Sequence, residues 1–379
     1  MITRAAVLNA MGADSPYASS KPLTIETLEL DGPGPGEVLV KVKAAGLCHS
    51  DLSVINGSRP RPMPMALGHE AAGIVEEVGP SEGGGEPDLR PGDHVVFVFV
   101  PSCGHCEPCT EGRPALCEPG AAANGAGTLL SGARRLHRED GTDVNHHLGV
   151  SGFAEYATVS RRSLVKVDPD LPLTEAALFG CAVLTGAGAV INTARMPAGA
   201  SAAVIGLGGV GLAALLGAVA AGARSIVAVD LSDEKLTFAS ELGATSTINA
   251  ADPEAAEQVR AATGGGVEYA FDFTGSTRAL DLGYRITRRG GMTVTAGLPA
   301  PNATMPLAPV TLVAEERTLK GSYIGTAVPT RDIPRYIALY RLGRLPVDRL
   351  LTGTIELDDI NEGFDRLHDG QAIRQVIAL

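Results

Sequence analysis

The second half of the chain alternates short apolar runs with amphipathic stretches. Two of these stretches, 233–242 and 253–262, carry apolar residues at helical spacing and predict helices. Asp233 is a suitable N-cap for the first helix, and Gly243 a suitable end. The apolar runs between the helices predict buried strands at 202–205, 225–229, 267–273 and 292–296. Regular alternation of strand and helix predicts a doubly wound parallel sheet and an α/β fold.

The first half follows a different pattern, in which β-rich runs at 38–43, 72–78 and 95–100 are separated by turn clusters. The Gly- and Pro-rich segment 80–91 predicts an exposed loop. The segment 119–145 has little periodicity and predicts a long surface loop, and we expect its basic residues to be solvated: Arg134, Arg135, His137 and Arg138.

The strand-helix alternation begins near residue 184 and weakens after residue 324. We therefore expect one domain to be inserted into another. The outer domain takes residues 1–183 and 325–379, and the inserted domain takes residues 184–324.

Composition and charge exclude several classes of function. The 379 residues include 31 Lys and Arg against 43 Asp and Glu, a net charge of −12, which disfavours nucleic acid as a main partner. Residues 1–9 have too few apolar residues for a signal peptide. The uncharged stretch between Arg195 and Arg224 is long enough to span a bilayer, but glycines crowd its centre and would break an isolated helix. We expect a cytoplasmic protein with no membrane partner.

A glycine motif follows the first predicted strand of the inserted domain. Residues 206–211 fit G-x-G-x-x-G, with Gly206, Gly208 and Gly211 at the fixed positions and Gly209 and Val210 between them. Such glycines allow a tight turn and close approach of a pyrophosphate to a helix N-terminus. Asp230 ends the next strand, where its carboxylate would bind ribose hydroxyls and repel a 2′-phosphate, favouring NAD over NADP. The alternatives are a chance glycine cluster and a structural capping role for Asp230.

Four of the six cysteines lie close together in the sequence, at Cys103, Cys106, Cys109 and Cys117. Four thiolates suit a tetrahedral zinc with no open position, which is a structural site. An iron–sulfur cluster is the second possibility, although the bacterial spacing for such clusters differs. Unligated cysteines are the third.

The other two cysteines, Cys48 and Cys181, are far apart in the sequence, and an isolated buried cysteine usually has only a packing role. Together with His69 they would supply two thiolates and an imidazole, leaving one zinc position open for water or substrate. The sequence pattern alone leaves both interpretations open.

Taken together, the segment 44–51, Gly68-His69-Glu70, the four-cysteine loop, Cys181 and the glycine motif occur in an order and spacing that resemble the zinc-dependent medium-chain alcohol dehydrogenases of liver or class III type. The resemblance covers essentially the whole chain. It implies a GroES-like, mainly β catalytic domain for the outer domain and a Rossmann NAD-binding domain for the inserted one. It also implies two zincs per chain, one structural and one catalytic.

The resemblance assigns roles to individual residues. Catalytic zinc would be held by Cys48, His69 and Cys181, with Glu70 as an alternative ligand and Asp51 orienting the histidine. Ser50 would take the alcohol proton. His49 and Arg374 would contact the cofactor pyrophosphate and Lys235 the adenosine ribose, although basic residues at such positions are often simply solvated.

Two positions depart from the family pattern. Ser53 stands where many members have the histidine that ends the proton relay, so either Ser53 passes the proton on through water or the ribose hydroxyls give it to solvent. His147 stands at a pocket position that is often aromatic, where it could contact the substrate. A hydrogen-bonded loop histidine is the alternative.

The resemblance implies an NAD-dependent oxidoreductase acting on primary alcohols and aldehydes. Phe99, Leu148 and Leu298 would line an apolar channel, which favours medium-chain or aromatic substrates. A glutathione-dependent formaldehyde dehydrogenase is the alternative, for which only the basic cluster at 134–138 offers anion-binding residues. A non-catalytic dinucleotide-binding protein is an alternative of another class, and it predicts loss of zinc ligands. A homodimer or homotetramer is expected by resemblance.

Overall fold

A computed structural model describes residues 1–81 and 88–379, so the middle of the loop predicted at 80–91 lies outside the described residues. The described residues divide into two units by their contacts. The first unit contains Met1–Cys181, Val328–Pro334 and Leu351–Leu379, and the second contains Ala182–Ala327 and Arg335–Leu350. The predicted domain bounds differ from this division mainly at residues 335–350 and stay a prediction.

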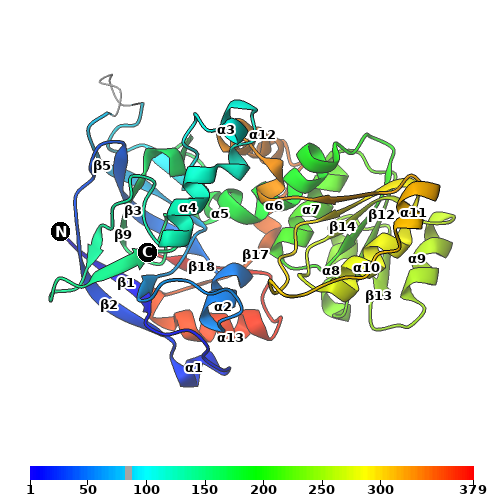
Figure 1. Cartoon of the computed structure of the whole chain (residues 1–379), viewed down its shortest axis with the longest axis horizontal. Helices are drawn as coiled ribbons and strands as arrows, with labels where there is room; N and C mark the ends of the chain where they lie inside the picture. The colour runs from blue at the N-terminus through cyan, green and yellow to red at the C-terminus, as the bar shows by residue number, and fades with distance from the viewer. Residues whose placement is uncertain (82–87) are drawn as a thin grey trace. The chain divides into compact units, whose positions relative to one another are not determined.

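The first unit is built on two mostly antiparallel sheets (Figure 1). A closed barrel runs in the order β1 (Ile2–Leu8), β2 (Leu23–Leu30), β7 (Leu136–His137), β8 (Asp143–His146) and β4 (Met65–Ala66). The other sheet runs in the order β10 (Leu164–Val167), β6 (His94–Phe97), β5 (Ala71–Val78), β3 (Glu37–Gly46), β18 (Arg374–Ala378) and β17 (Leu351–Ile355), with β9 (Tyr156–Ser160) also paired to β3. Alternate residues of β1 and β2, such as Ala5, Val7 and Leu28, form part of the barrel core.

Short helices connect these strands. They are α1 (Tyr17–Ser20), α2 (His49–Ile55), α3 (Glu107–Thr110), α4 (Glu118–Ala126), α5 (Leu173–Leu178) and α13 (Ile360–His368), with 3₁₀ turns at Pro114–Leu116, Arg161–Ser163 and Leu357–Asp359. A π-helical turn, η3 (Phe179–Val183), follows α5 directly. Helix α12 (Pro329–Arg341) begins in the first unit and ends in the second.

The segment 119–145 is not the solvated loop that the sequence predicts. It contains most of α4 together with β7 and most of β8, and its arginines are paired. Arg135 Nε donates to Glu37 Oε2 at 2.8 Å and Arg138 Nε to Glu26 Oε2 at 2.9 Å. The prediction is wrong because these acidic partners lie 98 and 112 residues away in the sequence.

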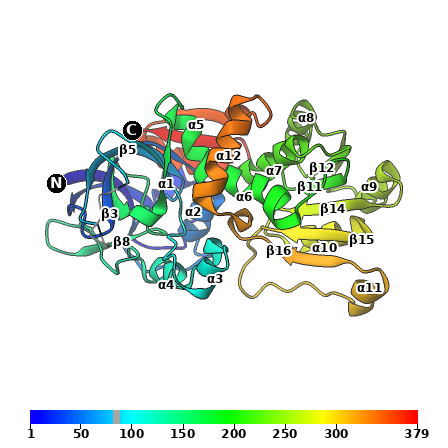
Figure 2. The same cartoon turned by 90° about the horizontal axis from the view of Figure 1, so that it is seen from above.

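The second unit contains a six-stranded sheet in which every described pair is parallel, so the predicted doubly wound α/β fold is confirmed. The strand order is β13 (Ser246–Asn249), β12 (Ser225–Asp230), β11 (Ser201–Ile205), β14 (Val267–Asp272), β15 (Thr287–Thr295) and β16 (Thr318–Gly321). Figure 2 shows the strands from β12 to β16 following one another in this order.

The helices of the second unit connect and cover these strands. They are α6 (Leu184–Gly188), α7 (Gly209–Ala220), α8 (Asp233–Glu241), α9 (Ala255–Thr263), α10 (Thr277–Ile286) and α11 (Pro309–Ala314), with a π-helical turn η4 (Ala189–Ala194) and 3₁₀ turns at Ile324–Thr326 and Val347–Leu350. Val259 of α9 packs in one cluster with Ala203 of β11 and Ile286 of α10. The N-cap of α8 is Ser232 rather than the predicted Asp233, because the Ser232 side chain accepts the Lys235 backbone N–H.

One helical run in the described residues, Leu173–Ala194, is apolar and long enough to cross a membrane by length and composition. Its mean hydropathy is 1.6, and 78% of the apolar window is buried inside the structure, as in the core helix of a soluble protein. The uncharged stretch between Arg195 and Arg224, which the sequence singles out, contains β11 and α7 instead.

Candidate functional site

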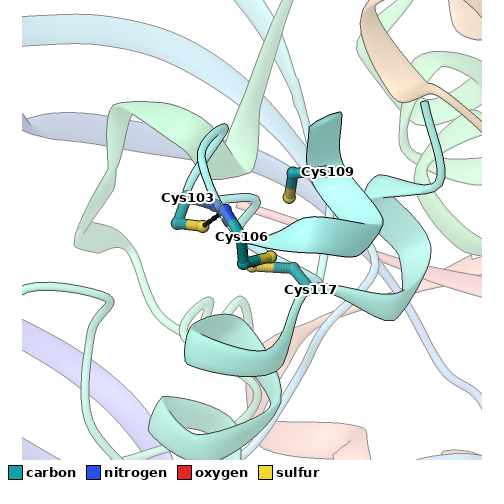
Figure 3. Close-up of side chains that lie close together, drawn as sticks. All are labelled: Cys103, Cys106, Cys109 and Cys117. Carbon is teal, nitrogen blue, oxygen red and sulfur yellow. Dashed lines mark hydrogen bonds between the residues drawn. The ribbon is translucent and has the colours of Figure 1, made fainter. Parts of the chain in front are cut away.

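The four-cysteine loop brings its sulfur atoms together (Figure 3). All four lie within 4.8 Å of one another, on the loop before α3, on α3 itself and at the residue before α4. Backbone N–H groups donate to them, from Cys106 to Cys103 Sγ at 3.3 Å and from Gly120 to Cys117 Sγ at 3.4 Å. Burial opposes ionisation of Cys103, but the backbone N–H groups of His105 and Cys106 lower its pKa to about 7. Four thiols so placed fit a tetrahedral structural zinc.

A second cluster lies in the first unit and is formed by Cys48, His69 and Cys181. Cys48 is the residue before α2, His69 follows β4, and Cys181 lies in the π-helical turn η3. All three side chains are buried and their ligand atoms lie within 4.8 Å of one another. Cys181 Sγ is 3.4 Å from His69 Nε2. Two thiols and one imidazole fit a zinc that keeps an open fourth position, and single π-helical turns are frequent at functional sites.

Buried charges surround this cluster. Contact with the Cys181 thiol, more than any other effect, holds the pKa of Cys48 well below its usual value, whereas the pKa of Cys181 is raised. Burial raises the pKa of Glu70 to about 7. The Arg374 guanidinium lies 3.7 Å from Glu70 Oε2 and donates to the Leu47 carbonyl at 2.9 Å. The site therefore holds acidic groups close to a single buried arginine.

Asp51 of α2 faces His69 from the side away from the thiols. His69 Nδ1 lies 3.1 Å from Asp51 Oδ1, which also accepts the Gly68 backbone N–H at 3.2 Å. His147 Nδ1 lies 3.1 Å from the same oxygen. Asp51 is expected beside His69 only from the family resemblance, and the proximity of His147 to Asp51 is not predicted from the sequence. No signal in the sequence links these two positions.

The remaining predicted residues of the first unit lie on α2 or near His69. His49 is exposed and Ser50 is half-buried, and both begin α2 beside Cys48. Ser53 Oγ donates to the His49 carbonyl at 2.8 Å. The Phe99 ring meets the His69 ring edge-on, with 5.2 Å between centroids, and Leu148 is buried.

The glycine motif forms the turn between β11 and α7 in the second unit. Gly206 has φ +86°, which favours glycine, and a Cβ at Gly211 would overlap the Gly206 carbonyl oxygen. Nothing lies within 4 Å of a Cβ built at Gly208, so this turn is open on one side. Helix α7 begins at Gly209 and continues through Val210. Such a turn, leading into a helix N-terminus, fits a pyrophosphate.

A cavity of about 540 Å³ lies beside this turn and is lined by Gly206, Asp230, Thr274 and Arg278 among others. Both carboxylate oxygens of Asp230 accept backbone N–H groups, from Leu207 and Ser232, so the structural role left open by the sequence is present too. Lys235 is half-buried on α8, and Leu298 is 51% exposed.

Family models match two segments of the chain. Residues 34–169 match the alcohol dehydrogenase GroES-like domain, and residues 209–341 match the zinc-binding dehydrogenase domain. Among curated relatives, the chain is 38% identical to S-(hydroxymethyl)glutathione dehydrogenase of Paracoccus denitrificans over the full length of both. It is 40% identical to the NDMA-dependent alcohol dehydrogenase of Amycolatopsis methanolica, covering all of this chain and 99% of the relative.

Solved structures of alcohol dehydrogenases are also similar to this chain over its full length. Benzyl alcohol dehydrogenase from Acinetobacter calcoaceticus is 33% identical with a TM-score of 0.90, and the match covers all of this chain and 99% of the other. An alcohol dehydrogenase zinc-binding domain protein from Burkholderia ambifaria is 36% identical with a TM-score of 0.93, at the same coverage. The similarity therefore extends over both units.

Proposed function

Because the chain belongs to the zinc-dependent medium-chain alcohol dehydrogenase family, we propose that it transfers a hydride between a primary alcohol, medium-chain or aromatic, and NAD. The observation that carries this proposal is the buried donor set of Cys48, His69 and Cys181. The reverse reaction reduces the aldehyde.

In this proposal, Cys48, His69 and Cys181 hold the catalytic zinc, and Glu70 is an alternative ligand. A zinc bound there would supply a Lewis acid that lowers the pKa of the substrate hydroxyl toward neutral pH. Asp51 holds the His69 ring by its Nδ1, which directs Nε2 toward the thiols. The four cysteines of the loop at 103–117 hold the structural zinc.

Ser50 takes the alcohol proton in this proposal, and Ser53, on the same helix, is the candidate to pass it on. Because the Ser53 hydroxyl donates to the His49 carbonyl, its own oxygen stays available to accept a proton through water. His147 Nδ1 lies 3.1 Å from Asp51 Oδ1, which supports a role for His147 in positioning.

NAD is the proposed acceptor, and it supplies the hydride-accepting nicotinamide when bound. Residues 206–211 would receive its pyrophosphate, and Asp230 would bind the ribose hydroxyls and repel a 2′-phosphate. Lys235 would approach the adenosine ribose. His49 and Arg374 would contact the pyrophosphate, with Arg374 exchanging part of its interaction with Glu70 for the phosphate charge.

A primary alcohol is favoured over a glutathione adduct because the basic cluster at 134–138 is already paired. Arg135 and Arg138 are bound to Glu37 and Glu26, and Arg134 Nε donates to Asn145 at 2.8 Å. Recruiting them for the carboxylates of glutathione would leave a nearly buried Glu37 without its cation. The non-catalytic alternative is disfavoured because all three catalytic zinc ligands are present and lie together.

The test is a panel of aliphatic, aromatic and polyol alcohols assayed by nicotinamide absorbance, with and without glutathione. NDMA, named in one relative, serves as a second acceptor in place of NAD. Oxidation of a primary alcohol with NAD and without glutathione supports the proposal, and no turnover of any alcohol or aldehyde overturns it. Metal analysis separates the enzyme, with about two zincs per chain, from the dinucleotide binder, with one or none.

We also propose that the chain assembles as a homodimer or homotetramer. Helix α11 supports this, because its Val310 and Val313 are 68% and 80% exposed and the helix leads into β16, the edge strand of the described sheet. A cytoplasmic location is proposed as well, because thiols held free in two clusters suit a reducing compartment.

A further inference from the structure

The buried carboxylate of Asp51 is in contact with two imidazoles. His69 Nδ1 and His147 Nδ1 each lie 3.1 Å from Asp51 Oδ1, and the side chains of the three residues are at most 1% exposed. The two rings meet edge-on, with 5.5 Å between centroids and an interplanar angle of 89°. We propose that His147 is a positioning residue, which fixes Asp51 and the His69 ring so that His69 Nε2 faces the two thiols.

The fold brings the two histidines together through a parallel strand pair. Strand β4 pairs with β8 in the register Met65 to Asn145 and Ala66 to His146, and both strands end at this point. The chain then continues from β4 to His69 and from β8 to His147. Because parallel strands end at the same edge, the side chains that follow them meet there. The arrangement is therefore a consequence of sheet pairing.

Backbone contacts hold His147 in this place. Its N–H donates to the Ala66 carbonyl at 3.3 Å and to Ser151 Oγ at 3.1 Å. Its carbonyl accepts the N–H groups of Val150 and Ser151, closing a tight turn. Leu148 and Ser151 in that turn have φ of +53° and +52°. A left-handed backbone at two non-glycine residues costs free energy and persists only where the surroundings demand it.

The polar contacts at Asp51 explain what His147 adds. Gly68 N and His69 Nδ1 are hydrogen-bonded to Oδ1, and His147 Nδ1 lies 3.1 Å from the same oxygen in an ion-pair contact. Neither His147 Nδ1 nor Asp51 Oδ2 has a hydrogen-bond partner within the described residues, so the Asp51 carboxylate is the polar group that faces His147 Nδ1. Without His147, only the Gly68 N–H and the His69 ring would hold this carboxylate in its orientation. The Nδ1–H of His147 favours one orientation, and the edge of its ring limits rotation of the His69 ring.

This inference rests on the proposed catalytic zinc at Cys48, His69 and Cys181, and a pair of substitutions tests it. His147→Phe keeps an aromatic ring against His69 but removes the Nδ1 donor. His147→Asn places an amide N–H near the Nδ1 position but leaves a cavity, because its side chain is smaller. If His147 has only a packing role, the Phe variant should retain zinc better than the Asn variant. If His147 has a positioning role, the Asn variant should retain zinc better.

The readouts are zinc retention under a chelator, measured by metal analysis, and the visible absorption of the enzyme loaded with Co²⁺, which reports ligand geometry. We expect His147→Phe to lose one of two zincs ~10–100-fold faster than wild type and to shift the cobalt bands. We expect His147→Asn to stay within a few-fold of wild type. In the Phe variant kcat should fall more than KM changes.

The outcomes separate the two proposals. A wild-type protein that holds only one zinc, lost on substitution of the four-cysteine loop, contradicts the proposed function itself. Two zincs in wild type with unchanged retention and cobalt bands in His147→Phe overturn the positioning role alone. The positioning role is also overturned if zinc retention follows side-chain size, so that the Asn variant loses zinc faster than the Phe variant. If His147→Phe does not fold, loss of the cobalt signature in His147→Ala and its recovery in His147→Asn decide the question.

Discussion

The backbone N–H of Leu207 donates a hydrogen bond to Asp230 Oδ2, with 2.6 Å between the two atoms. Ser232 N donates to the other oxygen at 3.0 Å. The carboxylate is thus held from both sides at the end of β12, on the wall of the cavity beside Gly206. A carboxylate anchored in this way cannot easily turn away from an approaching phosphate. Its repulsion of a 2′-phosphate should therefore be a fixed property of the site.

Substitution of Asp230 should weaken the proposed preference for NADH over NADPH. We expect the ratio of the two dissociation constants to fall at least about tenfold in Asp230→Asn, a change near 1.4 kcal/mol. The Asn amide keeps one oxygen, which can accept from one of the two backbone N–H groups, whereas Asp230→Gly removes the acceptor of both. Fluorescence titration with each nucleotide gives the ratio. Glu234→Gln is the matched control, because it also removes one negative charge, from an exposed position on α8. An unchanged ratio in both Asp230 variants would exclude the assignment.

Loss of the four-cysteine site should destabilise the protein without emptying the other zinc site. We expect Cys117→Ser to contain about one zinc per chain and to melt roughly 5 °C or more below wild type, since structural zinc contributes folding free energy. Cys181→Ser gives the reciprocal control, which should also lose one zinc but keep most of its thermal stability. Calorimetry and metal analysis provide the two measurements. Equal melting temperatures for Cys117→Ser and wild type would contradict a structural role.

Residue spacing along the chain is enough to predict the parallel sheet, the four-cysteine cluster and the glycine turn. The alternation of apolar runs and helices predicted the parallel sheet, and the spacing of Cys103, Cys106, Cys109 and Cys117 predicted their clustering. The turn at Gly206 was predictable because its backbone conformation favours glycine. Each of these features depends on residues that are close in the sequence or on a regular period.

Features that depend on long-range pairing were beyond the sequence pattern. The contact of His147 with Asp51 requires β4 and β8 to be neighbours, although the paired residues Ala66 and His146 are 80 positions apart in the sequence. The pairing of Arg135 with Glu37 joins residues 98 apart. The clustering of Cys48, His69 and Cys181 was implied by resemblance, and no local pattern marks the π-helical turn that carries Cys181.

His146 should make the protein less stable in mild acid. The side chain is buried, and Arg135 N donates to its Nε2 at 3.0 Å, so this nitrogen must stay unprotonated in the folded state. Burial, assisted by Arg134 and His137, lowers its pKa to about 3. The unfolded chain, with a histidine pKa near 6.5, therefore binds a proton below that pH that the folded chain does not. The contribution of neutral His146 to the free energy of unfolding is complete above about pH 6.5 and is lost as the pH falls toward 3.

The measurement is urea unfolding at pH 7 and pH 5. Between these pH values the free energy of unfolding of wild type should fall by about 2 kcal/mol more than that of His146→Gln. This follows from a loss of about 1.4 kcal/mol for each pH unit below the pKa of the unfolded chain. The Gln oxygen can still accept the Arg135 N–H. His368→Gln, which removes an exposed histidine, is the control and should follow wild type. Identical pH dependence in His146→Gln and wild type would show that His146 is not the group responsible.

Ser50 should affect turnover but not zinc binding. Its hydroxyl lies on α2, two residues after Cys48, and it is proposed to take the alcohol proton. We expect Ser50→Ala to lower kcat by about 10²-fold, a usual loss for a proton-transfer group, with the zinc content unchanged. Ser53→Ala serves as the comparison, with a smaller effect because water or ribose hydroxyls can replace it. Steady-state kinetics and metal analysis decide, and normal turnover in Ser50→Ala would refute its role.

A charge on α11 should disrupt assembly. Val313 is 80% exposed and lies with Val310 on α11, the helix that precedes the edge strand β16 of the described sheet in the chain. Apolar side chains exposed to this degree, on the helix that leads into the edge strand of a sheet, are typical of an interface between copies. Val313→Glu should therefore lower the mass measured by light scattering to that of one chain. Leu342→Glu changes a leucine that is 69% exposed elsewhere in the same unit and should leave the mass unchanged. A wild-type monomer, or an oligomer that tolerates Val313→Glu, would rule out this surface as the interface.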